Sequence, residues 1–423
     1  MHLMRFRVAF AVLVMVFARD GWAQDEGKSR TPEPKFVTVP AIIDHTHILI
    51  DVELPLADGS MQRVRAWVDN GNPDFTMSRR VSTMLGLNVS CNDSSCSASP
   101  PREIEIGGMR LSLAAVKKAE IPLKPVSTAA VMEPGLGTEI NIPSTVLRNY
   151  DVLVDFPGRQ FTIGYPGSIK FKGISTKVLL NAQNGLVQIP SQIEKKKFNL
   201  ALDLGASISF LAEEFFDALA QAHSDWPHMT GAVGPANLWG LDEETKWKVM
   251  RVDRLSYGPL HLTDVAMVDF PKDRMTYFAT RAGLPTAGLL GAQALLNYRV
   301  GIDYARSMVY FDLGRTYQFP DFDVIGLILR PENDGRFTIL GIADFEGKPS
   351  VTDVQPGDRL VAVDGIAVRG NTMGQVWSML GGTPGKERKL MIERDGREFS
   401  VTAGVRRFLA VAEEGDKGKS ARE

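Results

Sequence analysis

Two segments of this 423-residue chain end in the same tripeptide pattern, and each is followed by a second shared segment. Asp69-Asn70-Gly71 and Asp203-Leu204-Gly205 each come directly after a strand-like apolar run. Further along, residues 149–156 and 297–304 match at an Asn, a Tyr, a Val, a branched aliphatic residue, an Asp and an aromatic residue. Such a repeat indicates two copies of one supersecondary unit. If the copies pack about a pseudo-twofold axis, the two Asp-x-Gly turns meet, so the sequence predicts that Asp69 and Asp203 form a pair.

The bulk composition is that of a folded protein with about two to four domains of roughly 100–200 residues each. Hydrophobic residues make up 44% of the chain, charged residues make up 23%, and the formal net charge is -2. The densest basic cluster is Lys195-Lys196-Lys197, at a position where a hairpin turn is expected. Because nucleic-acid binding needs a basic surface that neutralises phosphates, we expect no nucleic-acid partner.

The N-terminus has the pattern of an export signal. Two arginines precede an apolar run over residues 8–18, and Gly21-Trp22-Ala23 offers the small residues of a cleavage site. The alternative, a membrane anchor, is disfavoured because charged residues end the run before it can span ~30 Å of hydrocarbon. We therefore expect a signal peptide over 1–23, a linker over 24–37, a periplasmic or extracellular location, and no membrane span after signal removal.

Cys91 and Cys96 are the only cysteines of the chain. In an oxidising compartment two cysteines this close are expected to form a disulfide. The alternative is half of a metal site, but no second cysteine pair and no nearby histidine supports it. His45 and His47 are expected on one strand face, again without a third ligand. We therefore predict a disulfide and no metal site.

Frequent short strands, glycine turns and a shortage of long helices favour a mainly β fold. In each copy we expect two strands before the Asp turn and a helix after it: 47–54, 61–68 and 79–87 in the first, 185–192, 197–202 and 212–221 in the second. Each copy also has a glycine-bounded apolar step, at 134–137 and at 288–291. We expect a long substrate-covering flap over 230–247 and a clipped flap in the region of the cysteine loop. The alternative for 230–247 is an ordinary surface hairpin.

Two carboxyl groups that share one proton can hydrolyse a peptide bond. One carboxylate accepts the proton of a water molecule while the other group, as an acid, polarises the carbonyl. Because two like charges at this separation cannot both ionise, the two pKa values split and the pair titrates as a unit. The glycine after each Asp permits a tight turn and, lacking a Cβ, leaves room for substrate. A single Asp-x-Gly is usually only a turn, so the repeat is what favours this chemistry.

The order of these features, appearing twice, resembles the retropepsin-like and pepsin-like aspartic proteases in a single-chain form. The resemblance rests on Asp69-Asn70-Gly71 with Thr76-Met77-Ser78 and Leu85-Gly86-Leu87, and on Asp203-Leu204-Gly205-Ala206-Ser207 with Gly288-Leu289-Leu290-Gly291. It covers about residues 38–315. It implies two retropepsin-like acid-protease β lobes in tandem, over 38–170 and 171–318, with Asp69 and Asp203 as the catalytic residues. The implied site loops contain Asn70, Gly71, Leu204, Gly205, Ala206 and Ser207.

The chain departs from the family pattern directly after each aspartate. The family has Thr or Ser there, and its hydroxyl bonds to the backbone of the opposite lobe. Asn70 can still donate such a bond, whereas Leu204 cannot and must pack elsewhere. A donor lost beneath the carboxylates leaves buried polar groups unpaired, at ~1–3 kcal/mol each. Two functions therefore stay open: an exported aspartic endopeptidase, or a catalytically degenerate peptide-binding pseudo-protease or scaffold.

Residues 322–407 resemble a PDZ domain, a small β barrel with helices. The resemblance rests on Ile325-Gly326-Leu327-Ile328, on the run from Pro356-Gly357-Asp358 to Asp364-Gly365, and on a helix-like stretch over 372–380. It implies that an extended peptide adds as a strand and that the loop holds its terminal carboxylate. The implied binding residues are Gly326, Leu327, Ile328, Thr372 and Val376. Alternatively, the module only packs against the lobes.

The two resemblances also indicate the partners. A polypeptide substrate or a peptide C-terminus is expected, and neither family pattern implies a metal or an organic cofactor. Because the two lobes already supply both aspartates, a monomer is sufficient for the site. The charged segment 408–423 is expected to be a disordered tail.

Overall fold

The computed structural model describes residues 33–92, 95–122, 137–314 and 322–410. The predicted signal peptide, and the greater part of the predicted linker and tail, lie outside these ranges. From Pro34 onward the chain forms one compact unit. Among the described residues no helix is long and apolar enough to cross a membrane.

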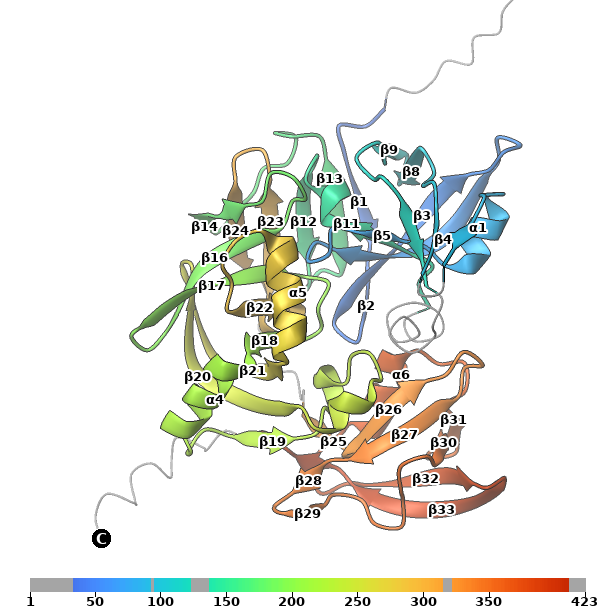
Figure 1. The fold of residues 1–423 in the computed structure, drawn as a ribbon, viewed down its shortest axis with the longest axis vertical. Helices are drawn as coiled ribbons and strands as arrows, with labels where there is room; N and C mark the ends of the chain where they lie inside the picture. Colours follow the sequence, from blue (N-terminus) through green and yellow to red (C-terminus); the bar gives the residue numbers. More distant parts are fainter. Residues whose placement is uncertain (1–32, 93–94, 123–136, 315–321, 411–423) are drawn as a thin grey trace, which may run out of the picture. The chain divides into compact units, whose positions relative to one another are not determined.

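Strands dominate the described chain, so the predicted mainly β fold class is confirmed (Figure 1). In the first half, one sheet has the order β11-β4-β3-β8-β9, with β2 paired to β3, and a smaller sheet has the order β5-β10-β7-β6. Their bounds are β2 (Ile42–Asp44), β3 (His47–Pro55), β4 (Met61–Asp69), β5 (Phe75–Thr76), β6 (Ser90–Cys91), β7 (Cys96–Ala98), β8 (Glu103–Ile106), β9 (Met109–Ser112), β10 (Ala119–Ile121) and β11 (Ile140–Pro143), with helices α1 (Arg79–Met84) and α3 (Ser144–Leu147).

The second half is built on an eight-stranded sheet of order β15-β16-β17-β22-β18-β21-β20-β19. Its strands are β15 (Leu179–Leu180), β16 (Val187–Ile193), β17 (Lys196–Asp203), β18 (Ser209–Ala212), β19 (His228–Thr230), β20 (Lys248–Tyr257), β21 (Leu260–Phe270) and β22 (Gly288–Gly291). Its helices are α4 (Glu213–Ala222), α5 (Lys272–Ala282) and the 3₁₀ turns η1 (Gly234–Ala236), η2 (Asp242–Thr245) and η3 (Ala292–Leu295).

The strands that lead into the two aspartates form where the sequence predicts them. In β4, Val64, Ala66 and Val68 are buried while the residues between them are partly exposed, which is the period-2 pattern of a strand with one covered face. In β17, the run from Leu200 to Leu202 is wholly buried, because β16 and β22 flank it and the core covers it. Each strand therefore ends at a buried position that its aspartate occupies.

A third sheet joins the two halves, with the order β1-β13-β12-β23-β24-β14 (Figure 1). Its strands are β1 (Phe36–Pro40), β12 (Asp151–Asp155), β13 (Gln160–Gly164), β14 (Ile174–Lys177), β23 (Tyr298–Asp303) and β24 (Met308–Leu313). The repeated segments β12 and β23 pair with each other, Asp151 opposite Asp303 and Asp155 opposite Arg299. In the repeat, Asp151 corresponds to Arg299 and Asp155 corresponds to Asp303. Exchanging each residue for its counterpart therefore turns one of these two pairs into the other. The register is therefore twofold symmetric at this point, with Leu153 and Gly301 at its centre.

The strands next to the aspartates pair in the same way in the two halves. β22 runs parallel to β17 with Gly291 opposite Asp203, and β11 runs parallel to β4 with Pro143 opposite Asp69. The segment that pairs in the first half as 288–291 does in the second is therefore Ile140–Pro143. The two segments are equivalent because each pairs with the strand that leads into an Asp-x-Gly turn. The Ile-Asn-Ile-Pro segment makes this pairing with β4 although it contains no glycine. The step expected at 134–137 lies, except for Gly137, outside the described residues.

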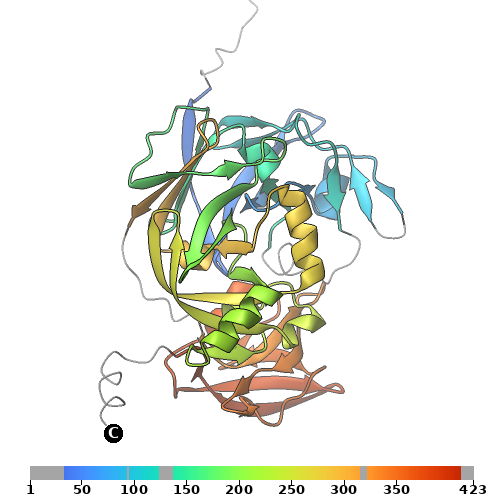
Figure 2. The ribbon, with the colours of Figure 1, turned by 60° about the vertical axis from the view of Figure 1, so that its left-hand side comes forward.

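The C-terminal part forms a separate sheet of order β26-β27-β30-β32-β33, with helix α6 beside it (orange to red in Figure 2). The elements are β25 (Asp323–Val324), β26 (Leu327–Pro331), β27 (Phe337–Ile342), β28 (Asp344–Phe345), β29 (Lys348–Pro349), β30 (Arg359–Val363), β31 (Ile366–Ala367), α6 (Met373–Leu380), β32 (Glu387–Arg394), β33 (Arg397–Gly404) and β34 (Arg406–Arg407). We call residues 322–410 the C-terminal module. Phe408 and Leu409 are buried, so the packed module extends beyond the predicted boundary at residue 407.

Candidate active site

The two Asp-x-Gly turns lie against each other. Asp69 ends β4 and Asp203 ends β17, and their exposed fractions are 2% and 7%. A Cβ placed on Gly71 would lie 2.0 Å from Cγ of Asp203, and one placed on Gly205 would lie 2.5 Å from Oδ1 of Asp69. Each glycine therefore faces the opposite aspartate at a distance that no side chain tolerates. The geometry places Asp69 and Asp203 side by side, and it gives the glycine of each motif a function.

The two carboxyl groups have different hydrogen-bond environments. Oδ1 of Asp203 accepts the backbone N–H groups of Gly205 and Ala206, each at 2.9 Å. Among the described residues, no group donates a hydrogen bond to the buried Oδ2 of Asp69. The negative charge is thus better stabilised on Asp203 than at that oxygen of Asp69.

Burial raises the pKa of both aspartates. For Asp69, burial is the largest cause and the negative charge of Asp203 adds to it. Together they raise the pKa well above its ordinary value, opposed by hydrogen bonding from Asn141, Asn72 and Gly71. For Asp203, burial raises the pKa to about 6, opposed by the hydrogen bonds from Gly205 and Ala206. With this order the pair holds two protons well below pH 6 and gives up the first near pH 6, after which one shared proton remains, as expected for two carboxyl groups that cannot both ionise.

Asn70 spans the gap between the turns. Its Nδ2 donates to the backbone oxygen of Leu202 at 2.7 Å, and its Oδ1 accepts the backbone N–H of Leu204 at 2.7 Å. These two groups flank Asp203, so a single amide from the first half fixes the backbone on both sides of the second aspartate. The side chain of Leu204 is 1% exposed and packs in the hydrophobic core. The hydrogen bond expected of Asn70 is confirmed. Leu204 makes no such side-chain bond, and its apolar side chain packs in the core instead.

A cleft of about 550 Å³ opens over the pair and takes its walls from both halves. Its lining combines the two Asp turns with aromatic, apolar and charged side chains: His47, Trp67, Asp69, Gly71, Asn72, Pro73, Asp74, Thr76, Glu120, Asn141, Asp203, Gly205, Ala206, Phe210, Leu238, Trp239, Phe270, Asp273, Arg274, Tyr277, Phe278, Arg281 and Leu289. The carboxyl groups therefore face an open cleft that both halves of the chain line.

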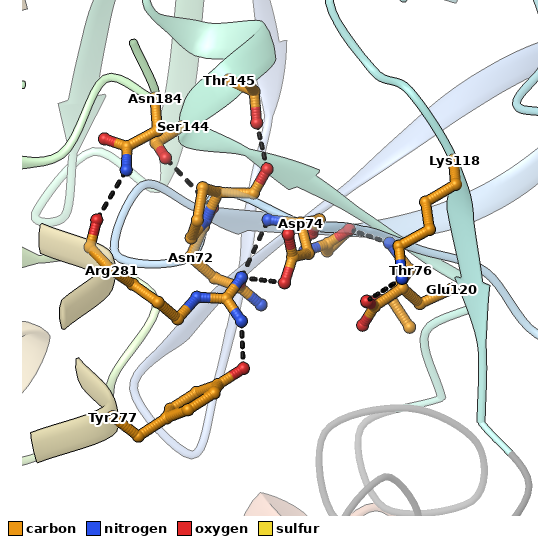
Figure 3. A network of polar contacts seen from close by, with 12 residues as sticks. Asn72, Asp74, Thr76, Lys118, Glu120, Ser144, Thr145, Asn184, Tyr277 and Arg281 are labelled. Atoms are coloured by element: carbon orange, nitrogen blue, oxygen red, sulfur yellow. Dashed lines mark hydrogen bonds and ion pairs between the residues drawn. The ribbon is translucent and has the colours of Figure 1, made fainter. Parts of the chain in front are cut away.

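Helix α5 supplies one wall of the cleft, which sequence analysis missed. Arg281 contacts Asp74 in an ion pair and bonds the hydroxyl of Tyr277, and its backbone oxygen accepts Nδ2 of Asn184 at 2.7 Å (Figure 3). The helix ends at Gly283, whose φ of 64° is the left-handed value of a helix C-terminal cap. That glycine signals the end of a helix, but the sequence does not indicate that the helix faces the aspartates.

The segment predicted to cover the cleft does reach it, although it forms the 3₁₀ turns η1 and η2 and not a hairpin. Within residues 230–247, the side chains of Leu238 and Trp239 line it. Trp239 stacks on Phe210 with ring centroids 6.0 Å apart, and the guanidinium of Arg274 lies 5.6 Å from its ring centroid. On the first-half side, Thr76 and Glu120 line the cleft. The disulfide between Cys91 and Cys96 is confirmed, and neither cysteine lines the cleft.

The remaining predicted site residues lie at two places. Ser207 is buried, and its hydroxyl donates to the backbone oxygen of Pro235 at 2.8 Å. The predicted peptide-binding residues lie around β26 and α6: Gly326, Leu327, Ile328 and Val376 are buried, and Thr372 caps α6 by accepting the N–H of Gln375. Their role in binding a peptide stays a prediction.

His45 and His47 do not share a strand face as expected. His45 lies in the turn between β2 and β3 with a φ of 48°, although the two rings still stack at 5.9 Å. Burial lowers the pKa of His45 to about 4 and, with the neighbouring His45, that of His47 to about 3. Within residues 33–92, 95–122, 137–314 and 322–410, no group of three or more His, Cys, Asp or Glu side chains is placed to hold a metal ion.

The chain was compared with protein families, with curated protein sequences and with solved structures. No family model and no curated protein sequence matches the chain. Among solved structures, the crystal structure of the aspartic proteinase from Irpex lacteus is similar, with a TM-score of 0.41 and 10% sequence identity. The match covers 66% of this chain and 97% of that one.

Proposed function

We propose that the protein is an exported, two-lobed aspartic endopeptidase that cleaves polypeptides with Asp69 and Asp203. The observation that carries the proposal is the reciprocal contact of the motifs, Gly71 against the carboxyl of Asp203 and Gly205 against that of Asp69. Two unrelated turns would not bury both carboxyl groups under one cleft. The N-terminal pattern and the Cys91–Cys96 disulfide support export.

The different environments of the two carboxyl groups suggest their roles. Asp203, whose carboxylate accepts two backbone N–H groups, acts as the base and takes a proton from water. Asp69, whose pKa is raised furthest, holds the shared proton and donates it to the carbonyl oxygen of the substrate. The water oxygen bonds to the carbonyl carbon and forms a tetrahedral intermediate. When the C–N bond breaks, Asp203 gives its proton to the leaving amine and a hydroxyl of the intermediate returns its proton to Asp69, so the dyad ends with Asp203 ionised and Asp69 protonated, as it began.

Leu204 favours a second candidate, a peptide-binding protein that has lost the chemistry. A hydroxyl beneath the pair is absent on that side, and a packed side chain takes its place. Such a protein would bind extended peptides in the same cleft without cleaving them. The C-terminal module, in either case, is proposed to be a PDZ-like domain that positions or recruits polypeptides.

Digestion of a mixed peptide library from pH 3 to 8 tests the first function against the second. We expect cleavage to be fastest near neutral pH. It should fall below about pH 6, where Asp203 also becomes protonated, and fall again as the pH rises through the pKa of Asp69. An Asp203→Asn or Asp69→Asn variant should be about 10³-fold or more slower. Binding of the same peptides to both variants separates loss of chemistry from loss of fold. Full activity in either variant, or a rate that still rises above pH 8, would contradict the dyad.

A further inference from the structure

One loop of the second half contacts the C-terminal module through a single buried side chain. Asn237, between η1 and η2, is fully buried. Its Oδ1 accepts the backbone N–H of Leu329 at 2.8 Å, and its Nδ2 donates to the backbone oxygen of the same residue at 3.0 Å. Leu329 belongs to β26, which forms the edge of its sheet. The Asn237 amide therefore makes the two bonds that a neighbouring strand would make to this edge.

Further contacts complete the attachment. Nδ2 of Asn237 also donates to the buried carboxyl of Glu244 at 2.6 Å, and its backbone oxygen accepts Nε2 of His45 at 2.9 Å. At the start of α6, Asp44 accepts the backbone N–H of Gly374 at 3.0 Å. A Cβ on Gly374 would lie 2.5 Å from the backbone nitrogen of His45, so the turn between β2 and β3 packs directly against the start of α6. The protein's own residues thus bond to the edge of β26 at Leu329 and to the N-terminal end of α6 at Gly374.

The same loop forms part of the cleft. Leu238 and Trp239 follow Asn237 directly and line the cleft over the aspartates. The N–H of Trp239 donates to Glu244 at 2.7 Å, so the carboxyl that anchors Asn237 also holds the tryptophan backbone. Ser207, in the Asp203 turn, donates to Pro235 of the same loop. Hydrogen bonds from this one loop therefore reach β26, the cleft wall and the second aspartate turn.

We propose that Asn237 is a positioning residue. By bonding the edge of β26 as an added strand would, it fixes the cleft wall formed by Leu238 and Trp239 and makes the C-terminal module part of the candidate active site. The occupant of the β26 edge is then this chain itself, and an outside peptide binds that edge only by displacing Asn237. The kinetic consequence rests on the proposed proteolytic function, whereas the structural consequence does not.

Hydrogen exchange of the full-length mature protein tests the structural consequence. In the unaltered protein we expect the Leu329 amide to be as protected as the paired amides of β27. Asn237→Ala should lower protection at Leu329 and over residues 234–241 by about tenfold or more, since a bond worth ~1.4 kcal/mol corresponds to a factor of ten. Asn371→Ala is the matched control, because its amide bonds only Ala367 and Val368 within the module. Unchanged protection at Leu329 in Asn237→Ala overturns the proposal.

Two further readouts need no new variant. If peptides are cleaved, Asn237→Ala should raise KM about 3- to 10-fold with a smaller change in kcat, because the wall binds substrate before and during reaction. Fluorescent peptides with free C-termini should bind the Asn237→Ala variant more tightly than the unaltered protein. Tight binding to the unaltered protein without added exchange over 234–241 overturns the proposal. Loss of the exchange effect refutes the positioning role, whereas absence of any cleavage with that effect intact refutes only the proteolytic function.

Should Asn237→Ala fail to fold, the exchange measurement on the unaltered protein still decides the matter. A Leu329 amide that exchanges as fast as an exposed amide, while β27 stays protected, overturns the proposal. Asn237→Gln keeps the amide on a longer side chain, and we expect it to restore part of the protection and of KM. That partial rescue separates a specific hydrogen bond from simple filling of space.

Discussion

In the first half the residue after the aspartate is Asn70, which reaches across and bonds the backbone on both sides of Asp203. In the second half the equivalent residue is Leu204, which is packed in the core. The carboxylates differ in the opposite sense, since Asp203 accepts two N–H groups and Oδ2 of Asp69 accepts none from the described residues. The two turns can therefore be related by a twofold axis in their backbone while their side chains make different hydrogen bonds. One half supplies the polar clamp, and the other supplies the better-stabilised anion.

The largest expected effect follows from removing the clamp. Asn70→Ala leaves the oxygen of Leu202 and the N–H of Leu204 buried without partners, which should lower the free energy of unfolding by about 4 kcal/mol. Urea denaturation measures this change. Asn181→Ala is the matched control, because Asn181 also makes one donor and one acceptor bond to backbone but is only half-buried, so we expect about 1 kcal/mol there. An equal decrease in the free energy of unfolding in the two variants would show that the hydrogen bonds of Asn70 stabilise the protein no more than those of Asn181.

The twofold plan itself was predictable from the sequence, and the asymmetry was only partly so. The repeat at 149–156 and 297–304 predicted two equivalent strands, and the register of β12 on β23 shows how they meet. Asn70 was predictable because an amide beside a motif aspartate has few other uses. Helix α5 in the cleft was not, because an amphipathic helix does not indicate which surface it covers. The role of Asn237 was not predictable from the sequence. Its partner is the backbone of Leu329, 92 residues away, and every residue has the same backbone groups, so the sequence does not indicate which one is bonded.

The next effect tests the electrostatic side of the comparison. The native pKa of Asp203, about 6, lies above the unfolded value of about 3.9, so the native state binds the proton more tightly. Stability from this group is full below about pH 4 and falls as the pH rises through 6. Asp203→Asn does not titrate, so it should be more stable than the unaltered protein at pH 7, by up to about 3 kcal/mol, and show no gain below pH 4. Thermal unfolding across pH measures the difference, and a variant that is less stable at pH 7 would contradict the raised pKa.

The smallest effect tests whether the missing clamp can be restored. By the twofold relation, a hydroxyl at position 204 would face the backbone of the Asp69 turn, as Asn70 faces that of Asp203. Leu204→Thr should lower the free energy of unfolding by about 2 kcal/mol, because buried apolar surface is lost but a new hydrogen bond offsets part of it. Leu54→Thr, in the same core and equally buried, has no such partner and should cost about 1 kcal/mol more. Equal costs would mean that the second turn has been rebuilt around Leu204, and that the two turns are equivalent in path but no longer in chemistry.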